Sequence, residues 1–127
     1  MAFTVDLTAA ANRHLQAATT LLDSRRDVAG YLFGIAAECA VKRLMALAGI
    51  RLNEAFYQHF PELRTLLRDF MSGRSAKVLA RFINDDGFMN NWDIKMRYAP
   101  ATQVRHEWVE RWALQARDVV GAMNAET

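Results

Sequence analysis

The sequence predicts an all-α fold: an up-and-down bundle of four to five helices that forms a single domain over residues 1–127. Three observations lead to this prediction. Apolar residues recur three or four positions apart along most of the chain, which is the spacing of one face of a helix. No alternating apolar pattern is long enough to predict a strand. Gly49, Gly73, Gly87 and Pro100 lie between the periodic segments, and Pro61 lies at the start of one.

The first two helices are predicted to be long antiparallel neighbours. The first covers residues 6–24, has Asp6 or Thr8 as its N-cap, and carries one apolar stripe, formed by Leu7, Ala11, Leu15, Ala18 and Leu22. Residues 25–27 form the turn. The second helix covers residues 27–48 and ends at Gly49, which suits the left-handed conformation that closes many helices. A connection this short places consecutive helices side by side.

Further helices are predicted in the rest of the chain. Pro61 suits the first position of a third helix, which stops at Ser72-Gly73. A short fourth helix covers residues 75–84, and residues 88–100 form a long connection. The last helix begins near Thr102 as N-cap and runs to about residue 122. One of its faces is apolar, and another carries His106, Glu110 and Arg117.

The second helix is apolar nearly all round, yet it carries Glu38 and Lys42 one turn apart. A helix of this composition is normally the central, buried helix of its domain. A buried charge is unfavourable unless it is paired. Two interpretations stay open: the pair lies at the edge of the buried face and is partly solvated, or it lines a cleft or a subunit interface. In the second case Glu38 and Lys42 form a polar floor with Arg97.

Composition narrows the function classes. The 127 residues include 52% hydrophobic and 24% charged residues, with a net charge of +2, so the chain is neither disordered nor a strongly basic nucleic-acid binder. The single Cys39 cannot form an internal disulfide, which fits a reducing cytoplasm. We expect no membrane segment and no N-terminal signal. Three scattered histidines and one cysteine give no metal-ligand spacing, so we expect no metal and no cofactor.

Arg97 is the leading candidate for a functional residue, because it lies beside Tyr98 and close to Trp92. A guanidinium there can stack on an aromatic ring or bind a phosphate through two hydrogen bonds. The alternative is a structural arginine that pairs with Asp93 or Glu38. His106 is either a catalytic histidine or an exposed surface residue.

Other candidates have a structural alternative of the same kind. His59, just before Pro61, either binds a ligand or anchors the start of the third helix through a hydrogen bond. His14 borders an apolar stripe, where a half-buried, hydrogen-bonded histidine is the ordinary case. Trp108 and Trp112 are one turn apart and are expected in the core or in a dimer interface. Basic residues outnumber acidic ones over residues 51–81, which indicates either a phosphate-bearing partner or a solvated helix surface.

Three stretches of the chain resemble the HEPN domain family, the small all-helical module of prokaryotic toxin–antitoxin, nucleotidyltransferase-associated and defence systems. The first is the Gly-Tyr-Leu-Phe-Gly-Ile-Ala-Ala-Glu segment that leads into Lys42, and the second is His59-Phe-Pro-Glu-Leu. The third is Trp92-Asp-Ile-Lys-Met-Arg-Tyr, before the last helix. With the order of the helices, the likeness spans roughly residues 7–122. The resemblance therefore covers nearly the whole chain.

This resemblance implies a homodimer with a cleft between its protomers, and a separately encoded nucleotidyltransferase-type antitoxin as a partner. Active members of the family cleave RNA without a metal, using an arginine followed by four to six residues and then a histidine. The histidine acts as general acid or base, and the arginine stabilises the developing charge on the phosphate. Here Arg97 and His106 have eight residues between them, so this sequence departs from the family spacing.

Three functions follow from these observations. The first is a HEPN-like module that binds a nucleotide or an RNA phosphate, with Glu38, Lys42, His59, Arg97 and Tyr98 as ligand-binding candidates. The second is an active, metal-independent ribonuclease toxin in which Arg97 and His106 meet despite their spacing. The third is a dimerisation partner without a ligand. The absence of the family spacing favours the binding module.

Overall fold

All described elements of the chain are helical. The computed structural model describes residues 3–50, 56–70 and 77–127, and over these residues it contains α-helices and short 3-10 helices but no strand. The α-helices are α1 (Leu7–Leu21), α2 (Arg26–Leu47), α4 (Glu62–Phe70), α5 (Lys77–Ile83) and α6 (His106–Glu126). The 3-10 helices are η1 (Ile94–Tyr98) and η2 (Ala101–Gln103). The all-α prediction is confirmed.

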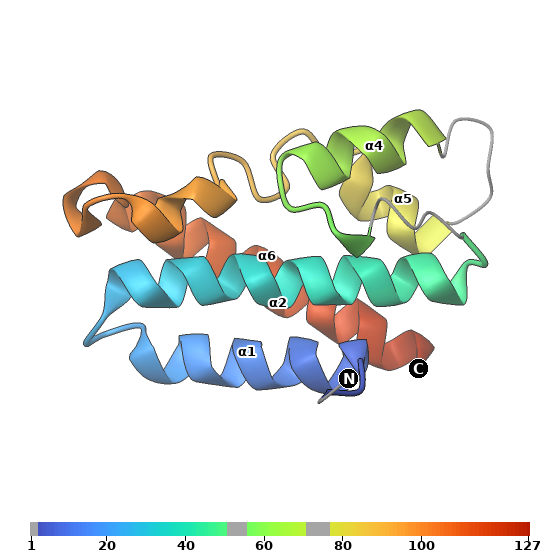
Figure 1. Ribbon diagram of the computed structural model, residues 1–127, viewed down its shortest axis with the longest axis horizontal. Helices are drawn as coiled ribbons and strands as arrows, with labels where there is room; N and C mark the ends of the chain where they lie inside the picture. Colours follow the sequence, from blue (N-terminus) through green and yellow to red (C-terminus); the bar gives the residue numbers. More distant parts are fainter. Residues whose placement is uncertain (1–2, 51–55, 71–76) are drawn as a thin grey trace.

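The two N-terminal helices form the antiparallel pair that their short connection predicts (Figure 1). Asp6 is the N-cap of α1, since its Oδ1 accepts a hydrogen bond from the backbone N–H of Ala9 at 3.0 Å. The turn lies at residues 22–25, slightly before the predicted position, because Arg26 is already the first residue of α2. Gly49 has a φ of +76° and follows the end of α2, as predicted.

The third long helix, α6, runs in the same direction as α2 (Figure 1). Near the start of both helices, Gly30 of α2 lies against Val109 and Trp112 of α6. Near their ends, Leu44 and Glu126 line the same cavity. The connection over residues 84–105 carries the chain back along the bundle before α6 begins (Figure 1). The predicted up-and-down topology therefore holds for α1 and α2, whereas α6 is parallel to α2.

The core lies along α2, which packs against both α1 and α6. Small residues of α2 let these helices approach closely, and the fully buried ones are Ala29, Ala36, Ala37 and Ala40. Trp92, one of the two largest buried side chains, comes from the connection before η1 and is 1% exposed. Its indole Nε1 donates to the Gly30 carbonyl at 3.0 Å, and its ring occupies the space that a side chain at Gly34 would fill. Trp92 thus fastens the segment that carries Arg97 to α2.

The predicted boundaries differ from the structure mainly before α6. The sequence predicts that the last helix begins near Thr102, but residues 101–103 form η2 and α6 begins at His106. Extended backbone at Val104 and Arg105, with ψ angles of 104° and 141°, separates the two. The helix predicted over residues 75–84 is α5, and the predicted stop at Ser72-Gly73 lies outside the described residues.

None of the helices that the structure describes combines the length and the apolar character needed to cross a lipid bilayer. The most apolar helix, α2, contains charged side chains at Glu38, Lys42 and Arg43. Each of these charges would be unfavourable in the hydrocarbon core of a bilayer.

Candidate functional site

The 3-10 helix η1 presents Arg97 and Tyr98 on the surface next to the start of α2. Asp93 caps η1, since its Oδ1 accepts from the backbone N–H of Lys95 at 2.9 Å. The Arg97 Nη2 donates to the hydroxyl of Tyr31 at 2.8 Å. The guanidinium carbon lies 5.5 Å from the centroid of the Tyr31 ring and 5.8 Å from that of Tyr98. Tyr98 is 83% exposed, so its ring is open to a ligand.

Arg97 is an exposed cation that two phenol groups hold in place. The hydroxyls of Tyr98 and then Tyr31 raise the pKa of Arg97 above its usual value. The guanidinium therefore stays charged throughout the physiological pH range. Because Arg97 lies on the surface, the N–H groups that do not bind Tyr31 can donate to an oxyanion from solvent. We refer to the surface formed by Tyr31, Arg97 and Tyr98 as the Arg97 surface.

Packing beneath the Arg97 surface fixes its position. The rings of Tyr31 and Trp92 stack with centroids 6.1 Å apart and an interplanar angle of 18°. Trp92 is in turn bound to the Gly30 carbonyl and buried against α2. The Tyr31 hydroxyl that binds Arg97 therefore belongs to a ring that is itself packed on the core. A preorganised cation of this kind loses little freedom when it binds a ligand.

A cavity of about 270 Å³ opens beside the Arg97 surface. It lies between the first turns of α2, the helix η1 and the segment that leads into α6. Its lining residues are Asp27, Val28, Tyr31, Met96, Arg97, Ala99, Ala101 and Val104. The walls are mostly apolar, and the polar groups are a carboxylate, a phenol and a guanidinium. Apolar walls with a few polar groups are the usual composition of a small-molecule site.

Glu38 is buried in a second cluster, which is separate from the Arg97 surface. The Glu38 side chain is 3% exposed. Its Oε1 lies 2.8 Å from His59 Nδ1, and its Oε2 accepts from the backbone N–H of Phe60 at 2.7 Å. Burial raises the pKa of Glu38, and the hydrogen bonds from His59 and Phe60 partly oppose this effect. Glu38 is thus buried rather than partly solvated, and its hydrogen-bond partners are in the segment that leads into α4.

Lys42 lies one turn further along α2 and is 8% exposed. Its ammonium is 5.6 Å from the centroid of the Phe56 ring. Burial lowers the pKa of Lys42, whereas the charge of Glu38 raises it. Among the residues that the structure describes, no carboxylate lies within ion-pair distance of Lys42. The predicted Glu38–Lys42 pair is therefore a longer-range interaction than a salt bridge.

The structure divides the predicted site residues into two groups. Arg97 and Tyr98 lie together with Tyr31, whereas Glu38 lies with His59 and Lys42. Tyr31 and Glu38 are seven residues apart on α2, which corresponds to about 10 Å along the helix axis. The carboxylate of Glu38 is occupied by His59 and Phe60, and Arg97 binds Tyr31 instead. His59 anchors the chain before α4, since its carbonyl also accepts from the backbone N–H of Leu63.

His106 is the exposed first residue of α6. Over residues 3–50, 56–70 and 77–127, no hydrogen bond or ion pair joins His106 to Arg97. The neighbouring Arg105 lies over the Trp108 ring, with 5.3 Å between the guanidinium carbon and the ring centroid. Convergence of His106 and Arg97 on one phosphate stays a prediction.

The remaining candidates have structural roles. His14 is half-buried, and its Nδ1 lies 2.7 Å from the Ala10 carbonyl, as expected for a histidine beside an apolar stripe. Trp112 is buried in the core and donates to the Asn90 carbonyl at 2.9 Å. Burial raises the pKa of Cys39, so this thiol is not activated. No group of three potential metal ligands occurs in the described part of the chain.

Two arginines of the basic central region have backbone partners. Arg64 of α4 donates to the carbonyls of Asp85 and Asp86 at 3.3 and 3.2 Å. Arg68 donates to the Ile83 carbonyl at 2.8 Å and forms an ion pair of 3.0 Å with the carboxylate of Asp86. These contacts stabilise the end of α5 and the turn after it. They favour a structural role for this part of the basic region.

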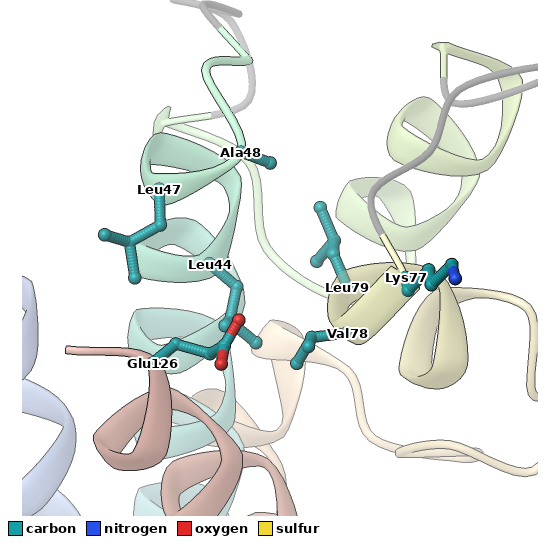
Figure 2. A pocket seen from close by; sticks show the side chains of 7 residues that line it. All are labelled: Leu44, Leu47, Ala48, Lys77, Val78, Leu79 and Glu126. Carbon is teal, nitrogen blue, oxygen red and sulfur yellow. The ribbon is translucent and has the colours of Figure 1, made fainter.

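A further cavity, of about 290 Å³, lies where the ends of α2 and α6 meet the start of α5 (Figure 2). Figure 2 shows side chains from the three helices around it, with Lys77 extending away from the others. The lining residues are Leu44, Leu47, Ala48, Lys77, Val78, Leu79 and Glu126. Lys77, from the basic region over residues 51–81, extends away from the other side chains (Figure 2), and none of the ligand-binding candidates Glu38, Lys42, His59, Arg97 and Tyr98 lines this cavity. The cavity therefore lies apart from the predicted phosphate-binding residues.

Sequence reasoning missed two residues of the site beside Arg97. Tyr31 holds the guanidinium and Asp27 lines the adjoining cavity. The sequence does contain a signal for Tyr31: it lies on the same stripe of α2 as Ile35 and Glu38, and the hydroxyl of a tyrosine in such a position usually has a hydrogen-bond partner. In the sequence, Asp27 is an acidic residue near a helix start, which is common for structural reasons alone.

Comparisons of this chain with family models, with curated proteins and with solved structures found no match. The geometry of the Arg97 surface is therefore the basis for the function proposed below.

Proposed function

We propose that this protein is a HEPN-like module that binds the phosphate of a nucleotide or of RNA on the Arg97 surface. The observation that carries the proposal is the arrangement of Arg97: an exposed guanidinium, held by the Tyr31 hydroxyl at 2.8 Å and flanked by an exposed Tyr98 ring. From the same resemblance we propose that the protein acts as a homodimer beside a nucleotidyltransferase-type antitoxin.

The chemistry of the three side chains fits a nucleotide better than a simple anion. A guanidinium binds a phosphate through two parallel charge-assisted hydrogen bonds. An exposed tyrosine beside it offers a flat surface on which a nucleobase can stack, and arginine next to aromatic rings is the usual combination in proteins that bind single-stranded nucleic acid. A lone exposed arginine would supply the first interaction but not the second.

The charge of the chain sets an expectation for the strength of binding. The net charge is +2, and the α4 arginines Arg64 and Arg68 are engaged with backbone carbonyls. Few phosphates of an RNA strand would therefore be neutralised, and the affinity should fall with salt much less steeply than that of a strongly basic RNA-binding protein. The expected ligand is a short stretch of single strand rather than a long duplex.

Fluorescence anisotropy with a labelled single-stranded RNA, in buffer with EDTA, tests this proposal. Arg97→Ala should weaken binding about tenfold, because it removes a charge-assisted hydrogen-bond donor. Arg117→Ala is the matched control, since Arg117 is exposed on α6 and is eleven residues beyond His106, about 16 Å along the helix. Equal affinities of the wild-type protein and the Arg97 variant would refute the proposal.

An active ribonuclease is the second candidate function. Arg97 and His106 are both exposed, and the segment between them folds into a compact turn at η2 that keeps η1 and the start of α6 at one end of the bundle (Figure 1). A histidine that moves a proton at the ribose hydroxyl and an arginine that stabilises the phosphate are sufficient for metal-independent cleavage. Cleavage of labelled RNA in EDTA, lost in both Arg97→Ala and His106→Ala, would establish this function. Intact RNA after incubation with the wild-type protein would exclude it under those conditions.

A further inference from the structure

The cavity beside Arg97 combines a carboxylate with apolar walls, which is more than a phosphate site requires. Asp27 and Tyr31 are one turn apart on α2 and so share a face of the helix. Both line the cavity of about 270 Å³, together with Val28, Met96 and Val104. This volume lies just below the usual range for ligand sites, about 300–1,000 Å³, and suits one heterocyclic base better than a larger molecule.

The polar groups of the cavity restrict which base it can hold. An ionised carboxylate only accepts hydrogen bonds. Asp27 Oδ1 lies 3.7 Å from the Nε of Arg25, in a partly exposed ion pair, and the second carboxylate oxygen is not part of that contact. A base bound at Asp27 must therefore present N–H donors. The side chains of Val28, Met96 and Val104 supply apolar contacts for its ring.

Among the four RNA bases, guanine alone presents two adjacent donors, N1–H and the N2 amino group, on its Watson–Crick edge. Adenine and cytosine each place a ring-nitrogen acceptor beside their amino group, and the single donor of uracil lies between two carbonyl acceptors. Each of these arrangements sets an acceptor against the carboxylate. Discrimination by hydrogen bonds along a base edge is the ordinary basis of sequence preference in single-stranded RNA.

We propose that this cavity binds guanine, with the Asp27 carboxylate accepting hydrogen bonds from the base and Arg97 binding the phosphate of the same nucleotide or of its neighbour. This inference rests on the proposed function, because it uses Arg97 as the phosphate site. The ligand class is a guanine nucleotide, either free or within an RNA strand.

Four labelled RNA pentamers that differ only at the central base, with uridine on both sides, test the inference by anisotropy in EDTA. The wild-type protein should bind the guanine pentamer at least about tenfold more tightly than the other three. Asp27→Asn should remove most of this preference, because the amide keeps one acceptor oxygen but puts an N–H donor in place of the other, and this donor faces one of the two guanine donors. Asp23→Asn is the matched control: Asp23 is an exposed carboxylate in the turn before α2, outside the cavity, and this variant should keep the preference.

The outcomes separate this inference from the proposed function. Equal binding of all four pentamers, with Arg97→Ala still weakening all of them, would overturn the guanine site and leave the phosphate site standing. Unchanged binding of all pentamers by Arg97→Ala would overturn both. A far-UV circular dichroism spectrum and a thermal unfolding midpoint equal to those of the wild type show that Asp27→Asn folds. Competition by free GMP but not by AMP would support the guanine site and show that a free nucleotide is a sufficient ligand. A preference for the guanine pentamer without competition by GMP would support a guanine site that binds the base only within an RNA strand.

Discussion

Replacement of Gly34 by alanine should destabilise the protein strongly, because Gly34 leaves the space that Trp92 occupies. A Cβ atom at this position would overlap Cε2 and Nε1 of the Trp92 indole. The indole would therefore have to leave its position. Trp92 is 1% exposed and donates to the Gly30 carbonyl at 3.0 Å. Both the burial and the hydrogen bond are lost when the ring moves away.

The size of the effect follows from these contacts. Loss of a buried tryptophan side chain costs about 3–5 kcal/mol, and the broken indole hydrogen bond adds about 1 kcal/mol. Alanine has a higher helix propensity than glycine, which by itself should raise the free energy of unfolding by about 1 kcal/mol. The net loss should be about 3–5 kcal/mol in the free energy of unfolding. Since small domains have stabilities of about 5–15 kcal/mol, the variant should be marginally folded.

Urea unfolding followed by far-UV circular dichroism measures this difference. Gly121→Ala is the matched control, because Gly121 lies within α6 and a Cβ atom added there would meet no other atom within 4 Å. This control should be stabilised by up to about 1 kcal/mol. If Gly34→Ala unfolds at the same urea concentration as Gly121→Ala, the packing of Trp92 against α2 described above is wrong.

Three further predictions test separate parts of the structure. Burial raises the pKa of Glu38, so the folded chain holds a proton there more readily than the unfolded chain. As the pH rises above 4.5, urea titrations should therefore show the wild type losing stability relative to Glu38→Gln, by at most about 1.4 kcal/mol per pH unit. A free energy of unfolding of the wild type that rises with pH relative to that of Glu38→Gln would contradict this sign. Asp6→Ala should lower the free energy of unfolding by about 1 kcal/mol in the same assay, because it removes the cap of the Ala9 N–H. Tyr31→Phe should weaken RNA binding several-fold in anisotropy assays while thermal unfolding stays near that of the wild type, because it frees Arg97 without emptying the core; unchanged affinity would show that the Tyr31 hydroxyl does not position the guanidinium.

The helices could be predicted because their signals are local. The cap at Asp6 and the left-handed Gly49 depend on residues within one turn, and both are confirmed. The start of α6 could not be predicted in the same way. Thr102 has the chemistry of an N-cap, but the backbone returns to extended angles at Val104 and Arg105 before the long helix begins. The direction of α6 depends on the path of residues 84–105, which carries no periodic pattern.

The site could be predicted only in part, because its contacts join distant segments. Arg97 stands out in the sequence through its aromatic neighbours, but its partner Tyr31 is 66 positions away. Glu38 stands out as a charge in an apolar helix, and its partner His59 is 21 positions away. Residue type identifies a side chain that needs a partner, whereas the fold decides which partner it meets. For this reason the sequence groups Glu38, Lys42 and Arg97, and the structure places Arg97 apart from the other two.

The most direct test of the phosphate site is an NMR titration of the ¹⁵N-labelled protein with a short single-stranded RNA in EDTA. The ¹H–¹⁵N spectrum includes the side-chain Nε–H of Arg97 as well as the backbone amides of the Arg97 surface. We expect the largest chemical-shift changes at Arg97, Tyr98 and Tyr31, and their loss in Arg97→Ala. Chemical-shift changes that are confined to α4 or to the cavity at the ends of α2 and α6 would contradict the assignment of nucleotide binding to this surface. A spectrum without any changes would contradict it as well.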